Sequence, residues 1–150
     1  MPNANDAELT DLYAAATTLD VADSEPNTGP PGQLAAPNFD LHVEAVAGNA
    51  IGNSGITYRM VLTCIDETLA APNATMSRAV DQAFNPASGW INPAVAVPPA
   101  VAVGNYLKEE KFTIIVPAGV RGHIFRYVGS LVSTNNEIVS LIESKPFVIV

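Results

Sequence analysis

The chain has 150 residues, a length that fits one domain with a core of its own. Of these residues 48% are hydrophobic and only 15% are charged, where an average soluble domain has about 25% charged residues. The net charge of −8 is uneven, because residues 1–58 contain eight acids and no Lys or Arg, which argues against nucleic acid and anionic membrane surfaces as partners.

The low fraction of charged residues has two possible explanations. The exposed surface could consist of uncharged Thr, Ser and Asn, or part of it could be buried against other subunits, since the cores of interfaces are depleted in charge. We favour the second explanation, with a homo-oligomer or a larger protein assembly as the expected state. Cys64 is the only cysteine, so no intramolecular disulfide is possible.

No membrane insertion is expected, because no segment reaches the about 18 apolar residues of a membrane span. The first residues also lack the basic start and apolar run of a signal peptide. Localisation stays open, with a virion or an extracellular assembly favoured over the cytoplasm.

Residues 1–37 are predicted to form an acidic N-terminal arm outside the fold. A short helix is expected over residues 3–19, where Asn5 can cap it and Glu8 follows three residues later. An extended segment over residues 13–21 is the alternative. Residues 23–37 are rich in Pro and Gly and predict a linker, which leaves residues 38–150 as a single domain.

The rest of the chain is predicted to form β-strands. Each segment is rich in β-branched and aromatic residues and is bounded by Gly, Pro or Asn. One or two weaker strands are expected between residues 75 and 103, where residues 77–84 could be a helical turn or an edge strand. The stronger strands are expected over residues 39–47, 56–66, 111–116, 123–132 and 137–149.

Short alternating strands with turn formers between them predict an all-β fold, an antiparallel β-sandwich of the immunoglobulin/fibronectin type or a jelly-roll. The inward faces of the first two strands are expected to carry Phe39, Leu41 and Val43, and then Tyr58, Met60, Leu62 and Cys64.

Residues 94–103 are apolar, uncharged and split by two prolines. Such a segment cannot pair along its whole length in a sheet, and a large exposed apolar patch marks an interaction site. We therefore predict a subunit or partner contact here. Trp90 could instead be a buried anchor or, exposed, a platform for a sugar ring. The predicted interface residues are Trp90, Val95, Val97, Pro98, Pro99, Val101, Val103 and Tyr106.

No pattern of catalytic or metal-binding residues is present in the sequence. His42 lies between Asp40 and Glu44 on a predicted outer strand face, and His123 stands at a strand entrance, without further ligands at metal-site spacing. Cys64 is expected to point inward, where a nucleophile would lack access. The neighbouring carboxylates at positions 66 and 67 should diverge, because adjacent side chains on a strand point apart.

Calcium is the one ion whose binding stays open. Asp20, Asp23 and Glu25 are closely spaced with Asn27 following, and calcium prefers such oxygen ligands. Acidic linkers are more often simply solvated. We therefore predict no catalytic residue, no cofactor and no metal site.

These features predict a non-enzymatic structural or assembly subunit of a larger complex. A virus or phage particle, a surface appendage or a secretion machine would suit the low charge and the arm. The alternative is a carbohydrate- or protein-binding accessory module, and a small enzyme is the third possibility.

Overall fold

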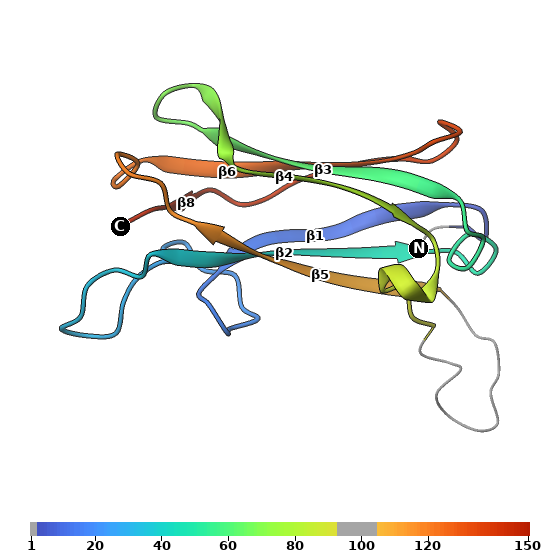
Figure 1. The fold of residues 1–150 in the computed structure, drawn as a ribbon, viewed down its shortest axis with the longest axis horizontal. Helices are drawn as coiled ribbons and strands as arrows, with labels where there is room; N and C mark the ends of the chain where they lie inside the picture. Colours follow the sequence, from blue (N-terminus) through green and yellow to red (C-terminus); the bar gives the residue numbers. More distant parts are fainter. Residues whose placement is uncertain (1–2, 93–104) are drawn as a thin grey trace.

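The computed structural model, which describes residues 3–92 and 105–150, consists of two antiparallel sheets packed face to face (Figure 1). The predicted all-β sandwich is confirmed. One sheet has three strands in the order β1-β2-β5, namely β1 (Ala7–Ala15), β2 (Asn38–Ala47) and β5 (Tyr106–Ile115). The five-stranded sheet has the order β4-β3-β6-β7, with β8 also paired to β6; its members are β3 (Thr57–Asp66), β4 (Ala71–Ala83), β6 (Ile124–Ser133), β7 (Val139–Glu143) and β8 (Phe147–Val148).

The core lies between the two sheets and is filled from both by alternate residues of each strand. In β3 the inward side chains are Tyr58, Met60, Leu62 and Cys64, all at most 1% exposed, as the alternation of the sequence predicts. β2 contributes inward residues along its whole length, namely Phe39, Leu41, Val43, Ala45 and Ala47. Removal of this apolar surface from water is the main stabilising contribution to the fold.

The helix expected over residues 3–19 is wrong, because residues 7–15 form strand β1. This strand pairs antiparallel with β2, from Ala7 opposite Ala47 to Ala15 opposite Asp40. Leu9 and Leu12 are buried in the core, so the segment is part of the sandwich and not of an arm outside it. The β-sheet partner decided the conformation, since helix propensity is a weak preference that tertiary contacts override.

Part of the segment predicted as a linker lies against the sandwich, although Leu34 farther along it is 93% exposed. Asn27 is fully buried, and its side chain is hydrogen-bonded to the backbone of Val150. The backbone N–H of Val148 donates to the carbonyl oxygen of Ser24 at 2.8 Å. The predicted boundary at residue 37 therefore does not divide an independent arm from the domain.

Three strand limits differ from the sequence-based expectation. Residues 77–84 fall almost wholly within β4, an edge strand whose proline, Pro72, stands near its start as the missing N–H requires. β5 begins at Tyr106, five residues before the expected start at Lys111. The strand expected over residues 137–149 is divided into β7 and β8 by the segment that holds Lys145 and Pro146.

Candidate functional site

The predicted interface residues are only partly placed by the structure. Val95, Val97, Pro98, Pro99, Val101 and Val103 lie outside the described residues. Trp90 is fully buried: its Nε1 donates to the hydroxyl of Tyr58 at 3.1 Å, and its ring lies 5.1 Å from that of Phe84. The indole thus anchors the loop in the core, so neither a sugar nor a partner meets it. Tyr106 is half-buried on the backbone of Gly52, and its interface role stays a prediction.

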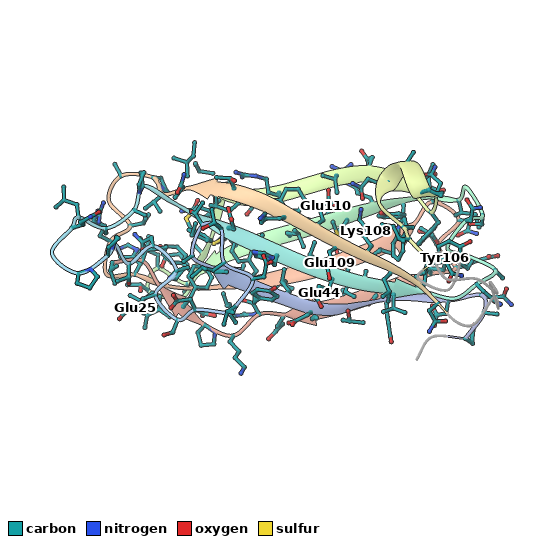
Figure 2. All side chains as sticks on the ribbon, turned by 90° about the horizontal axis from the view of Figure 1, so that it is seen from below. Glu25, Glu44, Tyr106, Lys108, Glu109 and Glu110 are labelled. Carbon is teal, nitrogen blue, oxygen red and sulfur yellow. The ribbon has the colours of Figure 1, made fainter. Side chains whose placement is uncertain are left out.

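A buried polar network continues from Trp90 across the interior, and sequence reasoning missed it. The Tyr58 hydroxyl donates to Gln82 Oε1 at 2.7 Å, and Gln82 Nε2 donates to Glu110 Oε1 at 3.0 Å. Lys108 Nζ lies 3.2 Å from Glu110 Oε2 and also bonds the carbonyl oxygen of Ser88. This network connects β5 of one sheet with β3 and β4 of the other (Figure 2 labels Lys108 and Glu110).

The signal for this network was present in the sequence. Counting back by twos from the buried Ile114 places Phe112, Glu110 and Lys108 on the inward face of one strand. Two opposite charges on an inward face predict a paired buried bridge, because an isolated buried charge is costly. The network links the two sheets, because its groups come from β5 on one side and from β3 and β4 on the other.

Cys64 points inward, as predicted, and is fully buried. Burial raises the pKa of its thiol to about 12; the hydrogen bond with Tyr127 acts in the opposite direction and Asp66 in the same one. A thiol with so high a pKa is almost wholly protonated at neutral pH and is a poor nucleophile. Cys64 is therefore a packing residue.

The neighbouring carboxylates Asp66 and Glu67 diverge, as predicted. Buried Asp66 bonds His123 Nδ1 at 2.7 Å and accepts the backbone N–H of Leu69 at 3.2 Å, while Glu67 bonds Arg126 on the outer side. Burial acts to raise the pKa of Asp66, but the hydrogen bonds from His123 and the backbone outweigh it, so this pKa lies below its ordinary value. Both acids stabilise the end of the sandwich and share no proton.

The three acids considered for calcium are not gathered around one point. Asp23 accepts the backbone N–H of Glu25 at 2.9 Å, Glu25 accepts the hydroxyl of Thr28 at 3.3 Å, and Asp20 turns toward His42. Within residues 3–92 and 105–150, no three His, Cys, Asp or Glu side chains lie close enough together to hold a metal ion.

The outer face of the three-stranded sheet is acidic. One row across it places Asp11 of β1, Glu44 of β2 and Glu109 of β5 opposite one another, and the next row places Tyr13 opposite His42 and His42 opposite Lys111. Figure 2, which views the molecule from this side, shows Glu44 and Glu109 on neighbouring strands. Below, "acidic face" denotes Asp11, Asp20, Asp40, Glu44 and Glu109.

The acidic face contains a depression of about 360 Å³ beside His42. The Tyr13 and His42 rings stack there with their centroids 4.8 Å apart and their planes 8° from parallel. Burial, followed by the charges of Asp11 and Glu109, raises the pKa of Glu44, and His42 opposes this change.

Part of the outer face of the five-stranded sheet is apolar, although Arg59, Arg126 and Ser130 share that face. Val139 is 58% exposed and Leu141 72% exposed on β7, and Val132 stands opposite Val139 on β6. Val61 of β3 and Val128 of β6 are half-buried on the same face, since their neighbours along each strand point into the core. Below, "apolar face" denotes Val61, Val128, Val132, Val139 and Leu141.

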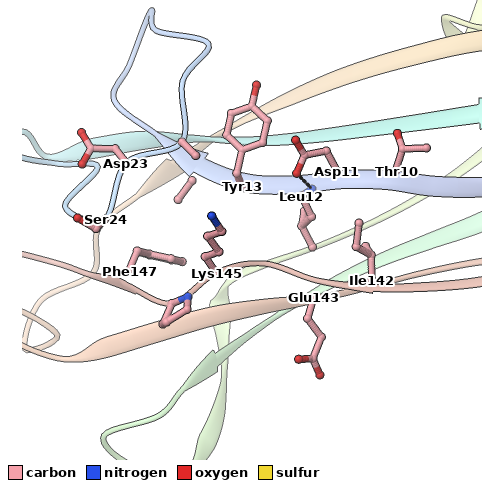
Figure 3. A pocket seen from close by; sticks show the side chains of 13 residues that line it. Thr10, Asp11, Leu12, Tyr13, Asp23, Ser24, Ile142, Glu143, Lys145 and Phe147 are labelled. Carbon is pink, nitrogen blue, oxygen red and sulfur yellow. Dashed lines mark hydrogen bonds between the residues drawn. The ribbon is translucent and has the colours of Figure 1, made fainter.

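A larger groove of about 610 Å³ runs where β1 approaches β7 and β8 (Figure 3). Its floor is formed by inter-sheet packing: Figure 3 shows Leu12 turned toward Ile142, with Phe147 farther along. The backbone N–H of Leu9 donates to the Ser140 hydroxyl at 2.9 Å nearby, which links the two sheet edges. Among the described residues, no buried polar side-chain atom that lines the groove lacks a hydrogen-bond partner.

Comparisons with known proteins give a fold and no family. No family model matches the chain, and no curated protein matches it. In the described part of the chain, no helix is long and apolar enough to cross a membrane. Among solved structures, the fold is similar to a bacterial adhesin from Mobiluncus mulieris that contains intramolecular disulfide, isopeptide and ester bond cross-links, with a TM-score of 0.50 and 8% identity over 96% of this chain and 49% of the adhesin chain. The chain thus spans about half the length of that adhesin chain, and at this identity the likeness shows the sandwich fold alone.

Proposed function

We propose that the chain is a non-enzymatic structural module of an extracellular or particle-borne protein assembly, in which copies associate through the apolar face. The observation that carries this proposal is the exposure of Val139 and Leu141 beside Val132 on one sheet surface. Exposed apolar side chains that adjoin one another gain free energy when a partner covers them, at about 25 cal/mol per Å² of apolar surface.

A second copy of the chain can pack on the apolar face without charge repulsion, because this face is nearly neutral. The arginines beside the apolar face are paired with acids: Arg59 Nη1 lies 3.9 Å from Asp81 Oδ2, and Arg126 Nη1 lies 3.0 Å from Glu143 Oε1. Like-charged patches repel when two copies approach, and the acidic face would suffer that repulsion. A two-fold contact brings the same patch of both copies together, which a nearly neutral apolar surface tolerates.

The class of assembly is proposed on two further grounds. The fold is shared with a chain described as a bacterial adhesin, which supports a surface-associated setting over a cytoplasmic one. The division into a β1-β2-β5 sheet and a β4-β3-β6-β7 sheet supports an immunoglobulin- or fibronectin-type sandwich over a jelly-roll.

The experiment is size-exclusion chromatography of the Val139→Asp/Leu141→Asp double variant. We expect a shift of the wild-type oligomer to monomer, with the circular dichroism of the sheets unchanged. The matched control is Val21→Asp/Leu34→Asp, which places the same charges on residues 70% and 93% exposed in the loop between β1 and β2. Oligomer retained in the Val139/Leu141 variant, or lost equally in the control, would remove the basis of the proposal.

A further inference from the structure

The row of three carboxylates on the acidic face has no cation of its own among the described residues. Asp11, Glu44 and Glu109 stand opposite one another on three strands, and none of them forms an ion pair within the described part of the chain. Lys111 lines the same depression, but its Nζ reaches toward Asp40, 4.0 Å away. Asp40 lies four residues from Glu44 along β2, with His42 between them. Like charges directly opposite across strands destabilise a sheet.

His42 gives a second and independent sign of a missing partner. Its side chain is 10% exposed, and its Nε2 is the one buried side-chain nitrogen or oxygen that lacks a hydrogen bond within the described residues. The nearest carboxylate oxygen recorded for it, Asp20 Oδ1, is 3.8 Å away, beyond hydrogen-bond distance. The stacked Tyr13 ring fixes the imidazole in this position.

The groups around His42 come from every neighbouring element. β1 supplies Tyr13 and Asp11, the loop after it Asp20, β2 Asp40 and Glu44, and β5 Glu109 and Lys111. Nearly all of these groups accept hydrogen bonds or carry negative charge. The depression therefore favours a ligand that donates hydrogen bonds and carries positive charge.

An ammonium group fits this arrangement better than a metal ion. Metal ions need several ligands at about 2.0–2.6 Å from one point, and no such group of side chains exists in the described part of the chain. An ammonium has three N–H donors that reach acceptors about 2.7–2.9 Å away, which suits separate acceptors around an open depression. The depression opens on the outer surface of a sheet, so a tethered cation can reach its carboxylates from solvent, and the exposed Asp20 side chain must shift before the cation meets the buried His42 Nε2.

We propose that this depression binds the ammonium group of a lysine side chain presented by a partner protein. His42 Nε2 accepts one N–H, and the carboxylates of Glu44 and Asp20 balance the charge, with Asp11 and Glu109 adding attraction. The site lies on the sheet opposite the apolar face, so the module contacts a second partner through a different surface from the one that joins its copies.

The test is a nuclear magnetic resonance titration of the full chain, at constant ionic strength, with a blocked Gly-Lys-Gly peptide. The His42 ring signals should shift saturably, while those of His123 at the end of the other sheet serve as an internal reference. The same peptide with norleucine for lysine should leave both rings unmoved. Glu44→Gln and Glu109→Gln should each weaken binding about tenfold, the loss expected for a charged hydrogen bond or close ion pair, whereas Glu137→Gln should leave it unchanged.

Three outcomes would overturn the assignment. Equal shifts with the norleucine peptide would show contact without recognition of the charge. Saturation by calcium chloride, or by spermidine when the lysine peptide fails, would assign the site to a metal ion or to a free polyamine. Equal affinity of the Glu44→Gln variant would place the peptide elsewhere. The folding of each variant is checked by the unmoved signals of His123.

Discussion

The side-chain amide of Asn27 pairs with the backbone of Val150 as a neighbouring strand would. Its Nδ2 donates to the Val150 carbonyl oxygen at 2.9 Å, and the Val150 N–H donates to Asn27 Oδ1 at 3.0 Å. The two residues are 123 positions apart in the chain, and Asn27 is fully buried. The Asn27 side chain thus adds to the Ser24–Val148 backbone hydrogen bond in holding the loop between β1 and β2 against residues 148–150.

Removal of this amide should therefore cost stability. We expect Asn27→Ala to lower the free energy of unfolding by about 1–3 kcal/mol, because the Val150 N–H loses its acceptor and the Val150 carbonyl oxygen keeps only the Arg121 guanidinium as a donor. Gln33→Ala, an exposed amide in the same loop, should change it by less than about 0.5 kcal/mol. Urea unfolding followed by circular dichroism measures both, and equal stability of the two variants would show that the loop is dispensable.

Strand β1 should be required for the fold. Leu12 is 2% exposed and reaches the backbone of Gly129 on the opposite sheet. Leu12→Ala should lower the free energy of unfolding by about 2–5 kcal/mol, the cost of a cavity in a packed core. Thr10→Ala on the same strand, at an exposed position, is the control. If a chain that lacks residues 3–16 unfolds as cooperatively as the full chain, β1 is an accessory strand.

Cys64 should lower the stability of the fold only at high pH. Burial raises the pKa of its thiol to about 12, whereas an unfolded thiol titrates near about 8.5. Its contribution to stability is thus present below about pH 8.5 and is lost as the pH rises toward the folded pKa, because the unfolded state then loses its proton first. Cys64→Ala should show a shallower loss of urea midpoint between neutral and alkaline pH. Rapid labelling of native Cys64 by a thiol reagent at neutral pH would contradict this account.

Asp66 should have the opposite pH dependence. Although burial acts against it, the hydrogen bonds from His123 and the backbone hold the pKa of Asp66 below its ordinary value. Its contribution is present above the unfolded pKa of about 3.9 and is lost as the pH falls through the folded pKa, because the unfolded state then binds more protons. The stability difference between the wild type and Asp66→Asn should shrink on acidification. A difference that stays constant between neutral pH and acid would show that the ionised form is not what the fold stabilises.

Where alternation was strong, the sequence predicted the strands well. β2, β3 and β6 were placed within one residue at each end, since each alternates apolar and polar residues next to Gly, Pro or Asn turns. β1 was missed because a capping pattern at Asn5 and Glu8 imitates a helix start, and local sequence does not show that β2 offers an unpaired edge. Asn27 was missed because a polar residue in a Pro/Gly-rich stretch gives no sign of its distant backbone partner.

The candidate surfaces were harder to predict than the fold. The low charge predicts that part of the surface is buried against other subunits, and this stays a prediction. Trp90, one of the predicted interface residues, lies in the core instead. The acidic row of Glu44 and Glu109 depends on strand register, which one sequence does not reveal. Only the pairing of three strands brings these residues opposite one another.

Sedimentation velocity of the wild-type chain over a concentration series, beside the Val139→Asp/Leu141→Asp variant, tests the central claim most directly. Association through the apolar face predicts that the wild-type sedimentation coefficient rises with concentration to that of a dimer or larger species, while the variant sediments as a monomer throughout. A wild-type chain that stays monomeric at every concentration, or a variant that associates as the wild type does, would contradict the account.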